Sequence, residues 1–153
     1  MKNLKLAALI FLILIAFACN SKKSKMEKLN SEFKIRENVV EEIIKTSPRY
    51  KQLTDGLNEV VLKNGGSSIG ISLEGSPNPK PYNSVSYSKT YDFSLYEVYT
   101  ERRMNTTRFS FNPENKQLYE YDAVYDQLNP IEFDKNLLFK YEYFLIKNAR
   151  RKY

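Results

Sequence analysis

The chain has 153 residues and a net charge of +6, with one cysteine and neither histidine nor tryptophan. This length suits a single domain, and the modest positive charge does not demand a nucleic-acid partner. Without histidine, Ser-His-Asp and Cys-His catalysis and histidine-bearing zinc sites are excluded. One cysteine forms neither an internal disulfide nor a thiolate metal cluster. We therefore expect no catalytic residue of these classes, no bound metal and no other cofactor.

The first eighteen residues have the pattern of an export signal. A basic start precedes an unbroken apolar run over residues 6–17, which ends at the small residue Ala18. The run is well short of the roughly 20 apolar residues that span a bilayer. The sequence therefore predicts a signal peptide over residues 1–18, cleaved between Ala18 and Cys19.

The position of the single cysteine makes this prediction more specific. Ala16-Phe17-Ala18-Cys19 resembles the lipobox of bacterial lipoproteins, with Ala16 where leucine is preferred and Phe17 where a small residue is usual. The resemblance implies cleavage by the lipoprotein signal peptidase, a diacylglyceryl group on the Cys19 thiol and a further acyl chain, of the palmitate type, on the new amino end. The alternative is an ordinary secretory signal.

Residues 19–35 are polar and rich in lysine, and we expect them to form a tether. Four of its lysines either rest on anionic headgroups, at about 1 kcal/mol each, or are simply solvated: Lys22, Lys23, Lys25 and Lys28. Asn20 is not the aspartate associated with inner-membrane retention of some lipoproteins. The resemblance thus favours a lipid-anchored protein of the cell envelope, in the outer membrane facing the periplasm, with a Gram-positive surface as the open alternative.

Two helices are predicted at the start of a domain over residues 36–153. Val39, Val40, Ile43 and Ile44 form an apolar stripe at helical spacing over residues 36–46. Ser47 and Pro48 suit the N-cap and first position of a second helix. Its apolar residues recur at three- and four-residue steps until a stop at 64–66, which predicts one helix over 48–63.

Alternation of apolar and polar residues predicts the strands that follow. Strands are expected over 67–74 and, after a proline-rich loop at 75–82, over 84–101. In the second of these the apolar phase shifts by one residue, which predicts a bulge or short turn near 94–96.

The remaining strands are separated by turn-forming residues. We expect a reversal at 102–105, a strand over 107–111, a turn at 112–115, a strand over 118–125, a turn at 127–130 and a short strand over 131–133. Asp134 is placed to cap a final helix that carries Leu137, Tyr141 and Phe144. The stretch 135–147 also alternates, so a last strand is the alternative.

The predicted fold class is α+β: an N-terminal helix packed on an antiparallel β-meander of about four or five strands, with a C-terminal helix. This order of elements is similar to that of cystatin-like and NTF2-like folds. Those folds serve inhibitors, adaptors, immunity proteins and occasionally enzymes, so the resemblance does not choose a function.

Two clusters are candidate sites. One is a candidate cationic aromatic binding patch made of Tyr96, Tyr99, Arg102 and Arg103, since Arg and Tyr dominate contact energies at interfaces. The alternative is a hairpin tip that its charges keep soluble. The other consists of the acidic residues Glu120, Asp122 and Asp126, which could form a calcium site or a catalytic carboxylate pair. Their spacing is not that of a calcium-binding loop, so we favour the solvated face of a strand.

These features favour a non-enzymatic binding or accessory module, of which an immunity protein or an inhibitor is one form. Its partners are the lipid membrane, through Cys19, and a protein or glycan; nucleic acid is not expected. The alternative is a small hydrolase of envelope glycans that uses two carboxylates about 5 to 10 Å apart.

Overall fold

The computed structural model describes residues 31, 33–79 and 85–149, and the chain divides into two units, Met1–Ile35 and Arg36–Tyr153. In the first unit, Ser31 and residues 33–35 are helical. The predicted signal peptide, Cys19 and most of the predicted tether lie outside the described residues. Among the residues that the structure describes, no helix combines the length and apolarity needed to cross a membrane.

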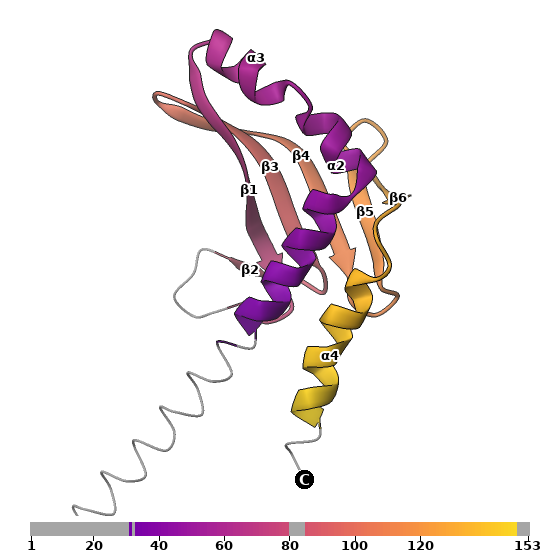
Figure 1. Ribbon diagram of the computed structural model, residues 1–153. Coiled ribbons are helices and arrows are strands. Elements are labelled where there is room, and N and C mark those ends of the chain that lie inside the picture. The colour runs from indigo at the N-terminus through magenta and orange to yellow at the C-terminus, as the bar shows by residue number, and fades with distance from the viewer. Residues whose placement is uncertain (1–30, 32, 80–84, 150–153) are drawn as a thin grey trace, which may run out of the picture. The chain divides into compact units, whose positions relative to one another are not determined.

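The second unit is α+β, as the sequence predicts (Figure 1). It opens with a helix over residues 36–46. The remaining elements are α2 (Pro48–Thr54), α3 (Leu57–Lys63), β1 (Gly66–Ser76), β2 (Ser86–Tyr87), β3 (Tyr91–Tyr99), β4 (Arg102–Asn112), β5 (Gln117–Asp122), β6 (Gln127–Ile131) and α4 (Leu137–Ala149).

The strands of the described residues form one curled sheet in the order β2-β1-β3-β4-β5-β6. Neighbouring strands from β1 to β6 are antiparallel, which confirms the meander, whereas the two-residue strand β2 pairs parallel to the end of β1. The sheet is therefore mixed and has six strands, where four or five were expected.

The core lies between one face of this sheet and the helices, and we call that face the inner face. The stripe Val39, Val40, Ile43 and Ile44 is at most 2 % exposed, so the predicted helix buries its apolar side completely. The sheet contributes alternate residues of three neighbouring strands and the segment after β6: Tyr91, Phe93, Leu95, Phe109, Phe111, Leu118 and Phe133. Residues between these on the strands, such as Ser94 and Arg108, lie on the outer face.

The predicted single helix over 48–63 is wrong. Ser47 caps α2 as predicted, because its side chain accepts a hydrogen bond from the backbone N–H of Tyr50. The helix ends at Thr54, and Gly56 has a φ of 68°, in the left-handed region that no right-handed helix continues through. The chain therefore restarts as α3 at Leu57.

The predicted irregularity near 94–96 occurs, but the extra residue is on the neighbouring strand. Leu95 pairs with Thr107 and Tyr96 pairs with Asn105, which leaves Thr106 of β4 as the bulged residue. β3 itself continues regularly, so Tyr96 lies on the outer face. There its ring covers Gly70, where a Cβ atom would come within 2.5 Å of the tyrosine oxygen.

Two predicted turns are displaced. The reversal expected at 102–105 is a tight turn at 100–101, because Tyr99 pairs directly with Arg102 and β4 starts there. The turn expected at 127–130 is instead the strand β6, and the chain turns at 123–126. Pro130 is tolerated in β6 because this strand is at the edge of the sheet, where one side needs no hydrogen-bond donor.

The helix predicted after Asp134 is confirmed as α4, and the alternative strand is excluded. Tyr141 is 2 % exposed, whereas Phe139 and Tyr143, which a strand would place on the same face, are 74 % and 59 % exposed. The Tyr141 ring packs edge-on against Phe111 and Tyr91. Burial raises the pKa of Tyr141 well above its ordinary value.

Candidate functional site

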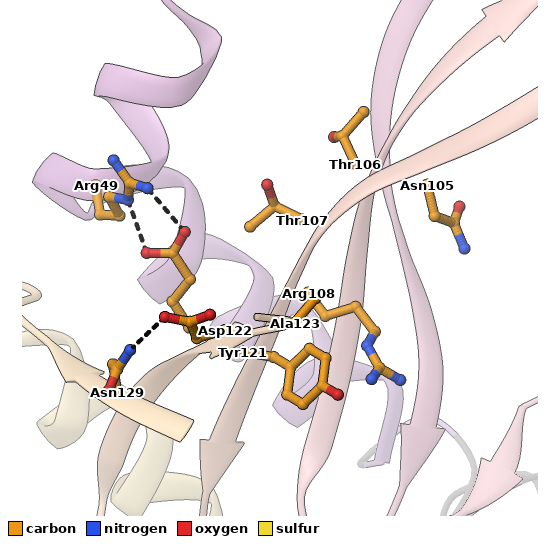
Figure 2. A pocket seen from close by; sticks show the side chains of 10 residues that line it. Arg49, Asn105, Thr106, Thr107, Arg108, Tyr121, Asp122, Ala123 and Asn129 are labelled. Carbon is orange, nitrogen blue, oxygen red and sulfur yellow. Dashed lines mark hydrogen bonds and ion pairs between the residues drawn. The ribbon is translucent and has the colours of Figure 1, made fainter. Parts of the chain in front are cut away.

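A cavity of about 570 Å³ opens where β4 and β5 separate (Figure 2). The ladder between these strands covers Phe109–Asn112 of β4 and Gln117–Glu120 of β5, and beyond it the strands part. The volume is within the range of small-molecule and peptide pockets. Its lining comes from α2, the two strands, the turn after β5 and β6: Arg49, Asn105, Thr106, Thr107, Arg108, Glu120, Tyr121, Asp122, Ala123 and Asn129.

An ion pair between α2 and β5 closes one side of this cavity. Arg49 donates from Nε to Glu120 Oε2 at 2.7 Å and from Nη2 to Glu120 Oε1 at 2.9 Å. A further N–H of Arg49 is held by Gln52. The hydrogen bonds from Arg49 to Glu120 raise the pKa of the guanidinium. Both oxygens of Glu120 are thus engaged, and the cap at Ser47, two residues earlier, fixes where Arg49 emerges from α2.

Asp122 and Asp126, the other two carboxylates of the acidic cluster in the sequence, accept hydrogen bonds in and beside the turn after β5. Asp122 Oδ1 accepts from the backbone N–H groups of Val124, at 2.9 Å, and Tyr125, at 3.2 Å. Asp126 accepts from the Tyr121 hydroxyl at 2.7 Å. The structure therefore separates these carboxylates into different local interactions. Within the described residues, no three Asp, Glu, Cys or His side chains are grouped as metal ligands.

Arg108 and Tyr121 form a stacked pair on the outer face that sequence reasoning missed. The Arg108 Cζ atom lies 4.2 Å from the centre of the Tyr121 ring. Figure 2 shows the pair beside the cavity, and both residues also line a second cavity of about 380 Å³ that includes Asp92 and Leu128. The two residues are on strands whose register the sequence does not reveal, so no sequence signal pointed to them.

The four residues of the predicted cationic patch share one hairpin but divide into two pairs. On the outer face, Arg103 Cζ lies 3.7 Å from the centre of the Tyr96 ring, and its Nη2 donates to Glu74 at 2.7 Å. Tyr99 and Arg102 are directly opposite each other in the β3–β4 register, on the other face, with Arg102 Cζ 5.9 Å from the ring. The patch is thus two arginine–tyrosine contacts on opposite faces of the β3–β4 hairpin.

The β3–β4 hairpin has one long side without a neighbouring strand. β4 pairs with β3 from Arg102 onwards, whereas its ladder with β5 begins only at Phe109. In the part of the chain that the structure describes, no strand pairs with the far side of Arg102–Arg108, and we name this side the open edge. Four residues of the open edge, Asn105 to Arg108, also line the larger cavity.

The Arg49–Glu120 pair is expected to stabilise the fold. Because the arginine side chain is 37 % exposed and the glutamate 19 %, solvent screens the pair in part. Arg49→Leu and Glu120→Gln should each lower the free energy of unfolding by about 1–2 kcal/mol, with a coupling of about 1 kcal/mol between them. Urea unfolding of both single variants and the double variant measures this coupling. Additive losses would contradict a direct interaction.

Comparison with protein-family models, with curated proteins and with solved structures finds no match. The function must therefore be inferred from the geometry of the cavity and of the open edge. It offers unpaired backbone groups along a strand, hydroxyl and amide side chains, and two arginines. These groups suit the binding of a polar, extended ligand.

Proposed function

We propose that the protein is a lipid-anchored lipoprotein of the cell envelope whose domain is a non-enzymatic binding module. Acyl chains on Cys19 hold it in the outer membrane, facing the periplasm. The domain binds an extended segment of another protein, as an immunity protein or an inhibitor does. The observation that carries the binding proposal is the open edge of β4 beside the larger cavity.

The open edge supports recognition by strand addition. Unpaired N–H and C=O groups of an edge strand pair readily with an incoming extended chain. The cavity beside Asn105–Arg108 leaves room for side chains of that chain. Main-chain hydrogen bonds would supply affinity, and the cavity lining would supply selectivity.

Charge favours an acidic segment. Arg103 is neutralised by Glu74, but within the described residues Arg102 and Arg108 have no carboxylate in ion-pair range. Both belong to the open edge, near its two ends. Acidic side chains at either end of a bound segment would complement them.

The carboxylates of the cavity favour binding over hydrolysis. A glycoside hydrolase needs one carboxyl group free to protonate the leaving oxygen and a second to act as a nucleophile or base. Both carboxylate oxygens of Glu120 accept hydrogen bonds from Arg49. Asp122 accepts hydrogen bonds from backbone N–H groups of the turn after β5. Neither group is placed for proton transfer to a ligand.

Filling the cavity tests the proposal. Ala123→Trp is expected to reduce cross-linking to partner proteins in intact cells by about tenfold, equivalent to about 1.4 kcal/mol of binding free energy. Ala123 is exposed and lines the cavity, so the larger side chain occupies the ligand's space without entering the core. Partners are identified by mass spectrometry after cross-linking and affinity purification of the anchored protein.

Val124→Trp is the matched control, because Val124 is the next residue, is 84 % exposed and does not line the cavity. It should cross-link as the unmodified protein does. Equal cross-linking by Ala123→Trp, or no protein partner at all, would contradict binding at the open edge.

A further inference from the structure

The open edge of β4 is closed at one end. β3 and β5 both pair with β4 at Phe109, Ser110 and Phe111, so the strand has a neighbour on each side there. A chain that adds to the open edge therefore cannot continue along β4 beyond Arg108. It has to end or turn away at this point, which we name the junction.

Side-chain pairs occupy both faces of the sheet at the junction. Glu120 is opposite Phe109, so its ion pair with Arg49 lies on the inner face. Arg108 and Tyr121 stack on the outer face, with Arg108 Cζ 4.2 Å from the centre of the ring. Both pairs line the larger cavity (Figure 2). An incoming chain thus meets β5 ahead of it and a side-chain pair on each face, so a chain end fits there better than a chain that continues.

The charges at the junction favour a carboxylate over an ammonium group as that chain end. Among the described residues, Arg108 has no carboxylate in ion-pair range. The nearby acidic groups are already engaged: Glu120 by Arg49, Asp122 by two backbone N–H groups and Asp126 by a tyrosine hydroxyl. A guanidinium offers parallel N–H donors that match the two oxygens of a carboxylate.

We propose that the bound segment is the free C-terminus of another protein, with its terminal carboxylate on Arg108 and its preceding residues paired to the open edge. This inference rests on the strand addition of the proposed function and specifies which part of the partner binds. It also fixes the direction of the segment. Because β4 runs from Arg102 towards the junction and the segment ends there, the added strand is parallel to β4. About seven residues span the open edge.

A random heptapeptide library, prepared once with free C-terminal carboxylates and once with C-terminal amides, tests the inference. The full-length mature protein, purified in detergent, is screened against both forms. Each selected sequence is then synthesised in both forms, labelled at its amino end and measured by fluorescence polarisation. The carboxylate form should bind about tenfold more tightly than the amide of the same sequence, because only the carboxylate makes a charged hydrogen bond with the arginine.

Arg108→Gln should remove this preference, so that the carboxylate and the amide of one sequence bind with equal affinity. The Arg108 side chain is exposed, so the variant is expected to fold, which circular dichroism checks. Lys51→Gln is the matched control, because it removes the same charge from an exposed position of α2 that does not line the cavity. This variant should keep the preference of about tenfold for the carboxylate.

Three results would overturn the inference. Peptides that bind equally well as carboxylate and amide, but more weakly to Ala123→Trp, would refute recognition of a chain end and leave strand addition at the open edge intact. A preference for the carboxylate that survives in Arg108→Gln, or that Lys51→Gln also abolishes, would refute the role of Arg108. A library without binders in either form, or binding that Ala123→Trp does not weaken, would refute the proposed binding site itself.

Discussion

Replacing Phe111 with alanine is expected to lower the free energy of unfolding by about 3–5 kcal/mol, the range typical of truncating a buried phenylalanine. Phe111 is fully buried, and its ring contacts Tyr91, Phe133 and Tyr141 at centroid distances of 6.5, 6.2 and 5.4 Å. The substitution therefore leaves a cavity between β4 and α4. Small domains have about 5–15 kcal/mol of stability in total, so the variant should be close to unfolding.

Urea unfolding followed by circular dichroism measures this loss. Phe139→Ala removes the same ring from an exposed position and should change the free energy of unfolding by no more than about 0.5 kcal/mol in the absence of membranes. Similar values for the two variants would show that the ring cluster around Phe111 is not the core.

Replacing Cys19 with serine is expected to abolish lipid attachment. The thioether to diacylglycerol requires the thiol, and by resemblance to bacterial lipoproteins the signal peptidase cuts only the lipid-modified precursor. Because each buried methylene contributes about 0.8 kcal/mol, loss of the acyl chains removes an anchor that no polypeptide contact of this size replaces. Metabolic labelling with an alkyne fatty acid, together with the mobility of the uncut precursor on a gel, measures both effects.

Ser21→Ala is the control for this experiment, since it alters a nearby tether residue and leaves the thiol in place. It should be labelled and cut normally. If Cys19→Ser is labelled and processed to the same extent as the unmodified chain, the signal is an ordinary secretory one and the lipoprotein proposal is wrong.

The side-chain interactions of the candidate site could not be predicted from the sequence. The acidic residues at 120, 122 and 126 and the arginine–tyrosine hairpin were visible in the sequence, but their interactions were not. Glu120 is engaged by Arg49, 71 positions earlier, and Arg108 stacks on Tyr121 of a different strand. Neither pair follows from spacing, because each depends on how a helix or a strand is placed against its neighbour.

Local sequence patterns determined the type and order of most elements. The stripe from Val39 to Ile44, the cap at Ser47 and the alternation in β1 each involve residues within one or two turns or one strand. Their side-chain period is a direct consequence of backbone geometry, so they predicted the α+β class and the final helix.

Only the tertiary structure decided the break at Gly56, the bulge at Thr106, the strand β6 and the open edge of β4. Each depends on strand register or on packing against a distant segment, and the free-energy differences between alternative registers come from contacts that no local pattern contains. The site proposed for binding exists because β4 extends beyond its pairing with β5.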